Sequence, residues 1–252
     1  MLQTTSMDHQ LPVTPLKNSE LGKKEQVQGM FDRIAGKYDF LNHFLTLGID
    51  RGWRRKTIRS LEDIAPKQIL DVATGTGDLA IAALRLHPEQ VTGVDISEGM
   101  LAIGKKKITA KGLGHKIRLQ SGDSEALAFP DKGFDAVTCA YGVRNFGNLN
   151  KGLSEMSRVL RPGGKIAILE FSMPSKFPVK QLYLFYFNHI LPFLGKMVSK
   201  DQTAYTYLPE SVAAFPEGKA FCTLLAQNGF TAIKERRLAF GITSLYIAIK
   251  SS

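Results

Sequence analysis

The chain has few cysteines and no sequence pattern typical of a metal site. Its 252 residues include two cysteines, Cys139 and Cys222, and neither has a second Cys or a His at metal-ligand spacing. This scarcity argues against a disulfide framework and a zinc site, and it fits a reducing cytoplasm. We therefore expect no bound metal, and we interpret both cysteines as small buried apolar residues.

Long apolar runs are also missing. No uninterrupted one is longer than Leu182 to Phe187, whereas a transmembrane helix needs about 20 apolar residues. The first ten residues lack the basic region and the apolar stretch of a secretory signal. We therefore predict a cytoplasmic protein that does not span a membrane.

Acidic residues are fewer than basic ones, at 23 Asp and Glu against 33 Lys and Arg, so the formal net charge is +10. Such a charge favours anionic partners such as nucleic acid or anionic lipid headgroups. The sequence has neither an aromatic and glycine RNA-binding motif nor a basic recognition helix with a turn signature, so we do not expect a nucleic-acid partner. The apolar fraction of 44% is ordinary for a packed core and excludes a disordered chain.

The middle of the chain alternates apolar strands with helices. The expected strands are 67–72, 91–95, 117–121, 134–139 and 165–171, and the expected helices are 78–87, 97–111 and 149–160. Strands that are apolar nearly throughout are typical of a parallel sheet covered by helices on both faces. This part of the chain therefore predicts an α/β fold.

Two strands end the chain. The segments 230–238 and 244–250 read as strands, and they follow a helix expected over 216–228. A short turn near Gly241 joins them, so we expect them to be antiparallel neighbours. The complete prediction is a seven-stranded, mostly parallel sheet with an antiparallel last strand pair, in a single domain over 21–252.

The segments outside this pattern have different compositions. Residues 1–20 are polar and aperiodic, and we expect a flexible tail. Apolar residues at helical spacing over 26–39, and again after Asp50, predict an N-terminal helical segment. The stretch 174–215 interrupts the strand and helix rhythm with many aromatic residues and lysines, and we expect a helical cap insertion there.

The most specific local signal is D-V-A-T-G-T-G-D, Asp71 to Asp78, between the first strand and its helix. Gly75 and Gly77 allow a tight turn and close approach of a ligand to the backbone around Thr76. The segment also fits the dinucleotide pattern G-x-G-x-x-G/A, so an NAD-dependent oxidoreductase is an alternative. However, a carboxylate at Asp71 suits an ammonium group and repels a pyrophosphate. S-adenosylmethionine, which carries an amino acid and no phosphate, fits better.

Two further strand ends carry candidate cofactor ligands. Asp95 ends the second strand, where a carboxylate can accept hydrogen bonds from both ribose hydroxyls of an adenosine-type cofactor or of NAD. Asp123 and Ser124 follow the third strand, and Asp123 could accept a hydrogen bond from an adenine amino group. These positions predict nucleoside binding at the carboxyl edge of the sheet.

The loop after the fourth strand carries the candidate catalytic residues. Open α/β sheets bind ligands at the carboxyl ends of central strands, and Tyr141, Arg144 and Asn145 follow such a strand. Arg144 could stabilise a developing oxyanion, and Asn145 could orient a hydroxyl or carbonyl group. A surface salt bridge accounts for Arg144 equally well. His43 is the one histidine that we would test as a base near the substrate.

Four segments together resemble the class I S-adenosylmethionine-dependent methyltransferases: D-V-A-T-G-T-G, V-D-I-S, G-D-S-E-A-L-A-F-P and R-V-L-R-P-G-G. Within that class the chain is similar to the quinone-biosynthesis C-methyltransferases from about Val27 to Ile249. The segments specific to that family are Y-D-F-L-N-H-F-L-T-L-G-I-D-R-G-W at 38–53, the loop 141–145, 158–164, and Y-T-Y-L-P-E-S at 205–211.

The resemblance implies a Rossmann-like class I methyltransferase fold and S-adenosylmethionine as the cofactor. The family's cofactor positions correspond to Thr76, Asp95, Asp123 and Ser124. The implied reaction is methyl transfer to a ring carbon of a lipophilic quinol, first of all demethylmenaquinol, with Tyr141 helping to orient the ring. A ubiquinone-pathway benzoquinol or another phenolic or lipid acceptor is the alternative, and a non-catalytic lipid-binding module is a more distant one.

A lipophilic substrate also suggests contact with a membrane. The aromatic stretch over 177–193 is flanked by Lys176, Lys180, Lys196 and Lys200, a composition that suits a lid or a patch on an anionic membrane surface. We therefore expect peripheral contact at the inner face of the membrane. The sequence admits a homodimer but does not determine the oligomeric state.

Overall fold

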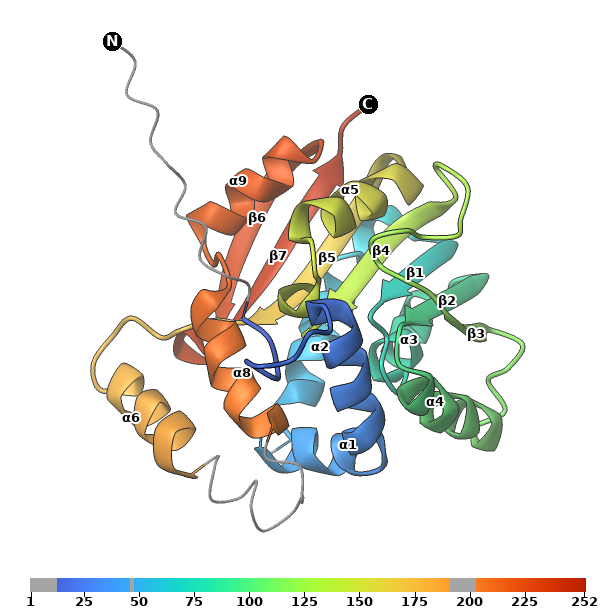
Figure 1. The fold of residues 1–252 in the computed structure, drawn as a ribbon. Helices are drawn as coiled ribbons and strands as arrows, with labels where there is room; N and C mark the ends of the chain where they lie inside the picture. The colour runs from blue at the N-terminus through green and yellow to red at the C-terminus, as the bar shows by residue number, and fades with distance from the viewer. Residues whose placement is uncertain (1–12, 46–47, 191–202) are drawn as a thin grey trace.

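The protein is built around a seven-stranded sheet (Figure 1). The computed structural model describes residues 13–45, 48–190 and 203–252. The strands are β1 (Gln68–Val72), β2 (Gln90–Asp95), β3 (Ile117–Ser121), β4 (Phe134–Ala140), β5 (Leu160–Phe171), β6 (Phe230–Leu238) and β7 (Thr243–Lys250). They lie in the order β3-β2-β1-β4-β5-β7-β6. Strands β1 to β5 are parallel, and β7 is antiparallel to both β5 and β6, which confirms the predicted topology.

Helices cover both faces of the sheet. They are α1 (Lys23–Leu45), α2 (Asp50–Arg59), α3 (Asp78–Ala83), α4 (Glu98–Ala110), α5 (Leu149–Val159), α6 (Val179–Phe185), α8 (Thr203–Ala214) and α9 (Lys219–Gln227). Short 3-10 turns span Glu62–Ile64, Leu84–Leu86, Val143–Asn145 and Ala239–Gly241, and a π-helical turn, Tyr186–Ile190, follows α6. Among the described helices, none is both long enough and apolar enough to cross a membrane.

Alternating strand residues divide the core into two layers. Leu70 and Val72 of β1 belong to the cluster that α5 and α9 cover, with Met156 and Phe221 among the helix residues. Ile69 belongs to the opposite cluster, which α2, α3 and α4 cover. Because successive side chains of a strand point to opposite faces, an almost continuously apolar strand such as β1 has to be covered on both sides.

Most of the predicted elements are confirmed, with differences at their ends. The predicted cap of α4 is present, since the Ser97 hydroxyl accepts a hydrogen bond from the Met100 N–H at 3.1 Å. R-P-G-G at 161–164 follows the helix as expected, but it belongs to β5, because Leu160 already pairs with Phe134. The last helix begins at Lys219 and not at 216. Of the two cysteines, Cys139 is buried as predicted, whereas Cys222 is only half-buried.

The N-terminal helices and the cap lie at the carboxyl ends of the parallel strands. Figure 1 shows α1, α2 and α8 gathered at this end of the sheet, with α6 farther out. Val27 and Met30 of α1 pack against Tyr207 of α8, so the two segments share one apolar cluster. Within the predicted cap, 179–190 and 203–214 are helical, whereas 174–178 are not helical and end in a turn before the first helix. Lys196 and Lys200 lie outside the described residues.

Candidate functional site

The glycine-rich loop after β1 makes a tight turn into α3. Gly75 and Gly77 have φ values of +57° and +81°, a backbone region that favours glycine. Helix α4 approaches this loop closely at Gly104, where a Cβ atom would lie 2.6 Å from Leu119 and 3.1 Å from the backbone carbonyl of Thr76. The loop therefore presents its backbone at the edge of the sheet, as the sequence predicted.

Asp95 stands at the end of β2 directly beside this loop. Its carboxylate accepts hydrogen bonds from the Gly75 N–H at 2.7 Å and from the Ser97 N–H at 2.9 Å. Burial raises the pKa of Asp95, and these backbone bonds oppose that rise. Each oxygen retains lone-pair capacity, so Asp95 is a suitable acceptor for a ribose diol.

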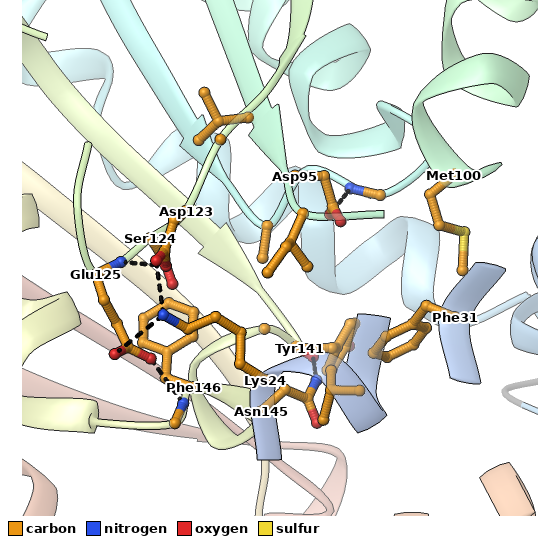
Figure 2. Close-up of a pocket in the computed structure, with 18 of the residues that line it drawn as sticks. Lys24, Phe31, Asp95, Met100, Asp123, Ser124, Glu125, Tyr141, Asn145 and Phe146 are labelled. Atoms are coloured by element: carbon orange, nitrogen blue, oxygen red, sulfur yellow. Dashed lines mark hydrogen bonds and ion pairs between the residues drawn. The ribbon is translucent and has the colours of Figure 1, made fainter. Parts of the chain in front are cut away.

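A cleft with about 700 Å³ of empty space, open to solvent at its mouth, extends from Asp95 to the loop after β3. Figure 2 shows Met100 near Asp95, and Asp123 and Ser124 on the opposite side. Asn145 lines the cleft between them, and its buried Oδ1 atom has no hydrogen-bond partner within the described parts of the chain. A buried acceptor without a protein partner remains available to a donor from outside the chain.

Helix α1 reaches across this cleft. Lys24 contacts Asp123 at 2.6 Å and Glu125 at 3.6 Å (Figure 2). Burial raises the pKa of Asp123, but the bonds from Lys24 and from the Glu125 N–H outweigh burial and hold that pKa below its ordinary value. Asp123 is therefore a charged acceptor whose present partner is a lysine, in the position where the sequence predicted an adenine contact.

A smaller cavity of about 350 Å³ continues beneath the glycine-rich loop. Asp71 lies at its base and accepts hydrogen bonds from Thr74 at 2.6 Å and from Thr138 at 2.7 Å. Burial raises the pKa of Asp71 to about 6. Arg54, which directly follows the family-specific segment 38–53, also lines this cavity and pairs with Asp50 at 2.5 Å. The cavity thus brings a buried carboxylate and a guanidinium together.

Polar contacts around Thr76 fix the loop that lines this second cavity. The Thr76 hydroxyl donates to Asp39 at 2.5 Å and accepts from Lys107 at 3.1 Å. Lys107 also contacts Asp78 at 2.6 Å, so the carboxylate in the first turn of α3 is already paired. A phosphate at this helix terminus would meet that carboxylate, which agrees with the predicted preference for a ligand without phosphate.

A third and largely apolar cavity, with about 1910 Å³ of empty space including its opening to solvent, adjoins the other two. Its walls come from α1, α2, α6, α8 and the turn between β6 and β7, and its apolar side chains include Phe171, Phe187 and Leu208. Tyr38 and Tyr141 line all three cavities, so these two residues mark where they meet. The Tyr141 ring stacks on Phe171 at a centroid distance of 4.4 Å.

Arg144 faces the third cavity and is held by a buried ion pair. Its Nη1 atom donates to Glu170 Oε1 at 2.7 Å and to the Tyr141 carbonyl at 2.5 Å. The Glu170 side chain is fully buried, and 8% of the Arg144 side chain is exposed. The surface salt bridge that the sequence allowed for Arg144 is therefore wrong: its ionic partner, twenty-six residues later in the sequence at the end of β5, is inside the protein.

The predicted residues divide among the three cavities. Gly75, Asp95, Asp123, Ser124, Tyr141 and Asn145 line the first cavity, Asp71 and Thr76 the second, and Arg144 the third. Gly77 shapes the loop without lining a cavity, and the side chain of His43 in α1 lies outside the described part of the structure. The prediction missed Lys24, Tyr38 and Arg54. Tyr38 lies inside the family-specific segment 38–53 and Arg54 directly follows it, whereas Lys24 had no such signal.

The glycine-rich crossover, the carboxylate ending β2 and this strand order define the class I S-adenosylmethionine-dependent methyltransferase fold. A SAM-dependent methyltransferase of Thermotoga maritima, described as a possible histamine N-methyltransferase, has this fold with a TM-score of 0.63 and 18% identity; the match covers 89% of this chain and 100% of that one. Phosphoethanolamine N-methyltransferase 2 of Haemonchus contortus, solved with S-adenosylmethionine, matches with a TM-score of 0.59 and 16% identity over 90% of this chain and 60% of that one.

The chain belongs to the ubiE/COQ5 methyltransferase family, which it matches over residues 19–250. The demethylmenaquinone methyltransferase of Bacteroides fragilis is 51% identical, over 94% of this chain and 97% of the relative. The ubiquinone/menaquinone biosynthesis C-methyltransferase UbiE of Geobacter sulfurreducens is 44% identical over 90% of each chain. The protein is thus an S-adenosylmethionine-dependent methyltransferase, which decides against the oxidoreductase and non-catalytic alternatives.

Proposed function

We propose that this enzyme transfers a methyl group from S-adenosylmethionine to a ring carbon of demethylmenaquinol. The observation that carries the proposal is the apolar cavity of about 1910 Å³ that meets the cofactor cleft at Tyr38 and Tyr141. A polar aromatic ring with a long apolar tail matches this cavity, which is apolar along most of its walls and polar around Arg144. The names of relatives at 44–51% identity support the same acceptor.

The first two cavities divide the cofactor's polar groups between them. Asp95 would accept hydrogen bonds from the ribose hydroxyls, and Asp123 would accept from the adenine amino group. At the methionine end, Asp71 would attract the ammonium group and Arg54 the carboxylate, since the two residues line the same small cavity. When bound, S-adenosylmethionine supplies a methyl group on a positively charged sulfur, and the quinol ring carbon takes that methyl with net loss of one proton.

Arg144 acts on the acceptor ring in this proposal, and Asn145 contacts the bound ligand from the first cavity. Arg144 stays protonated, so it would stabilise the negative charge that a quinol oxygen acquires when its proton leaves. Glu170 fixes the guanidinium in place, which reduces the reorganisation that this stabilisation requires. The Asn145 amide donates to the Tyr141 carbonyl at 3.2 Å and leaves its Oδ1 atom available to orient a ligand hydroxyl. The surrounding apolar walls exclude water from the reacting groups.

A benzoquinol is the second candidate acceptor, because the Geobacter sulfurreducens relative is named for both the ubiquinone and the menaquinone pathways. The test is transfer of labelled methyl to demethylmenaquinol and to the benzoquinol analogue, side by side. We expect methylated naphthoquinol as the main product. Labelling of the benzoquinol alone would select the second candidate, and labelling of neither would refute both.

We further propose that the cavity mouth contacts an anionic membrane surface. Leu182 and Phe240 line the cavity and are nevertheless 64% and 85% exposed. Lys176 and Lys180 are also exposed and lie at the start of the cap, next to Leu182 in the chain. Each lysine near anionic lipid adds about 1 kcal/mol of attraction.

The test is sedimentation with anionic liposomes at low salt. Phe240→Ser should weaken binding, whereas Leu21→Ser, at another exposed apolar residue, should not. Wild-type protein that stays in the supernatant would refute the contact.

A further inference from the structure

Two buried tyrosines of the cap belong to the wall of the third cavity. Tyr183 of α6 and Tyr207 of α8 both line it and are 6% and 3% exposed. Within the described residues, neither hydroxyl has a hydrogen-bond partner. Leaving a buried hydroxyl unpaired is costly, so two such groups on one cavity indicate a ligand that pairs with them.

Both phenols lie within the electrostatic field of Arg144. Burial raises the pKa of Tyr207 to about 12 and also raises that of Tyr183, while the charge of Arg144 acts in the opposite direction on each. The two hydroxyls therefore stay protonated near neutral pH and can donate. The buried Nε of Arg144 likewise has no partner among the residues described. The cavity wall thus contains three residues, from three separate elements, that each carry a buried donor without a partner among the described residues.

Packing holds the two rings rigidly. The Tyr183 ring stacks on Phe187 at a centroid distance of 4.2 Å. Tyr207 packs between Val27 and Met30 of α1. Rigid donors lose little conformational freedom when a ligand binds, so their hydrogen bonds contribute more to orientation. The sequence motif at 205–211, which marked the family but had no assigned role, contributes one of them.

We propose that Tyr183 and Tyr207 are positioning residues that donate hydrogen bonds to a ring oxygen of the phenolic acceptor, beside Arg144. This inference rests on the proposed function and adds the direction in which the acceptor binds. The oxygenated ring lies beside Arg144, and the apolar tail leaves the cavity past Leu182 and Phe240. The hydrogen bonds strengthen as the oxygen becomes an anion, so they favour the reactive form of the ring over the resting one.

The test compares Tyr183→Phe and Tyr207→Phe with the wild type, and uses Tyr246→Phe as the matched control. Tyr246 is also a buried tyrosine, but its hydroxyl accepts from the Gly218 N–H away from the cavities. Loss of a hydrogen bond to a developing anion should lower kcat/KM for demethylmenaquinol about ten-fold or more in each cavity variant. The rising limb of the pH–rate profile should also move to higher pH, because the phenols no longer favour ionisation of the acceptor.

Two further measurements separate this role from a merely structural one. The affinity for S-adenosylhomocysteine should be the same in both cavity variants as in the wild type. With a naphthol analogue that lacks one ring oxygen, the two substitutions should cost less than with the full quinol, which is the coupling expected of a direct contact. Wild-type kcat/KM and an unshifted pH profile in both variants would refute the inference alone. Failure of the unmodified protein to methylate any quinol would refute the proposed function and this inference together.

Discussion

The buried pair of Arg144 and Glu170 provides the sharpest test of how the site is built. Replacing Glu170 by Gln keeps its shape but removes its charge, which leaves the guanidinium without a counter-ion. Removing one partner of a buried ion pair typically costs about 3–5 kcal/mol of unfolding free energy. Solvent screens this pair little, because 0% of the Glu170 and 8% of the Arg144 side chain is exposed. For a domain of this size, such a loss lowers Tm by about 6–20 °C.

The assay is urea unfolding of Glu170→Gln, Arg144→Met and the double variant. The double variant removes both charges, so we expect it to recover much of the stability lost in Glu170→Gln and yet to remain inactive. Removal of the exposed pair Lys17 and Glu210, with 75% and 40% of the side chains exposed, is the control and should cost at most about 1 kcal/mol. A Glu170→Gln protein within 1 kcal/mol of the wild type, or strictly additive effects, would refute the reasoning.

Three other predictions concern the cofactor site. Asp95→Asn should weaken S-adenosylhomocysteine binding about 10–100-fold in calorimetry, because hydrogen bonds to a charged acceptor are lost; an unchanged Kd would contradict its role. Lys24→Met should tighten S-adenosylhomocysteine binding by up to about five-fold, because it frees Asp123 and removes a positive charge from the cleft. Lys17→Met, the control, should leave the binding unchanged. Weaker binding by Lys24→Met would argue that Lys24 assists the cofactor. Finally, folding raises the pKa of Asp71 from 3.8 to about 6. Between pH 3.8 and about 6, Asp71 therefore holds a proton in the folded protein that it has lost in the unfolded chain. The free energy of unfolding should fall by roughly 3 kcal/mol as the pH rises through this range. Measured by urea unfolding from pH 4 to 7, the free energy of unfolding should depend less on pH in Asp71→Asn than in the wild type. The same pH dependence in both proteins would contradict this prediction.

The order of the elements and the cofactor edge could be read from local patterns. Apolar strands, helix caps such as Ser97 and positive-φ glycines each depend on a few neighbouring residues. They can therefore be recognised in the sequence without knowledge of the fold. Asp71, Asp95 and Asp123 each end a strand or follow one, and parallel strands bring their carboxyl ends to one edge. That rule needs no knowledge of side-chain contacts, and it is the reason why most of the cofactor candidates line two adjoining cavities.

The substrate side could not be read in this way. Lys24, Arg54, Tyr183 and Tyr207 come from segments up to 183 residues apart, and no local pattern records which of their side chains meet. The partner of Arg144 is Glu170, which looks like one polar residue at the end of an apolar strand until the fold buries both charges together.

The sheet, the glycine-rich turn and the likeness to the family follow from residue types and their spacing, so they can be predicted without coordinates. Two features are visible only in the folded protein: an apolar cavity meets the neighbouring cleft at Tyr38 and Tyr141, and Arg144 is an interior charge rather than a surface one. The physical reason is that burial and desolvation are set by every segment packed around a group, and here those segments are distant in the chain.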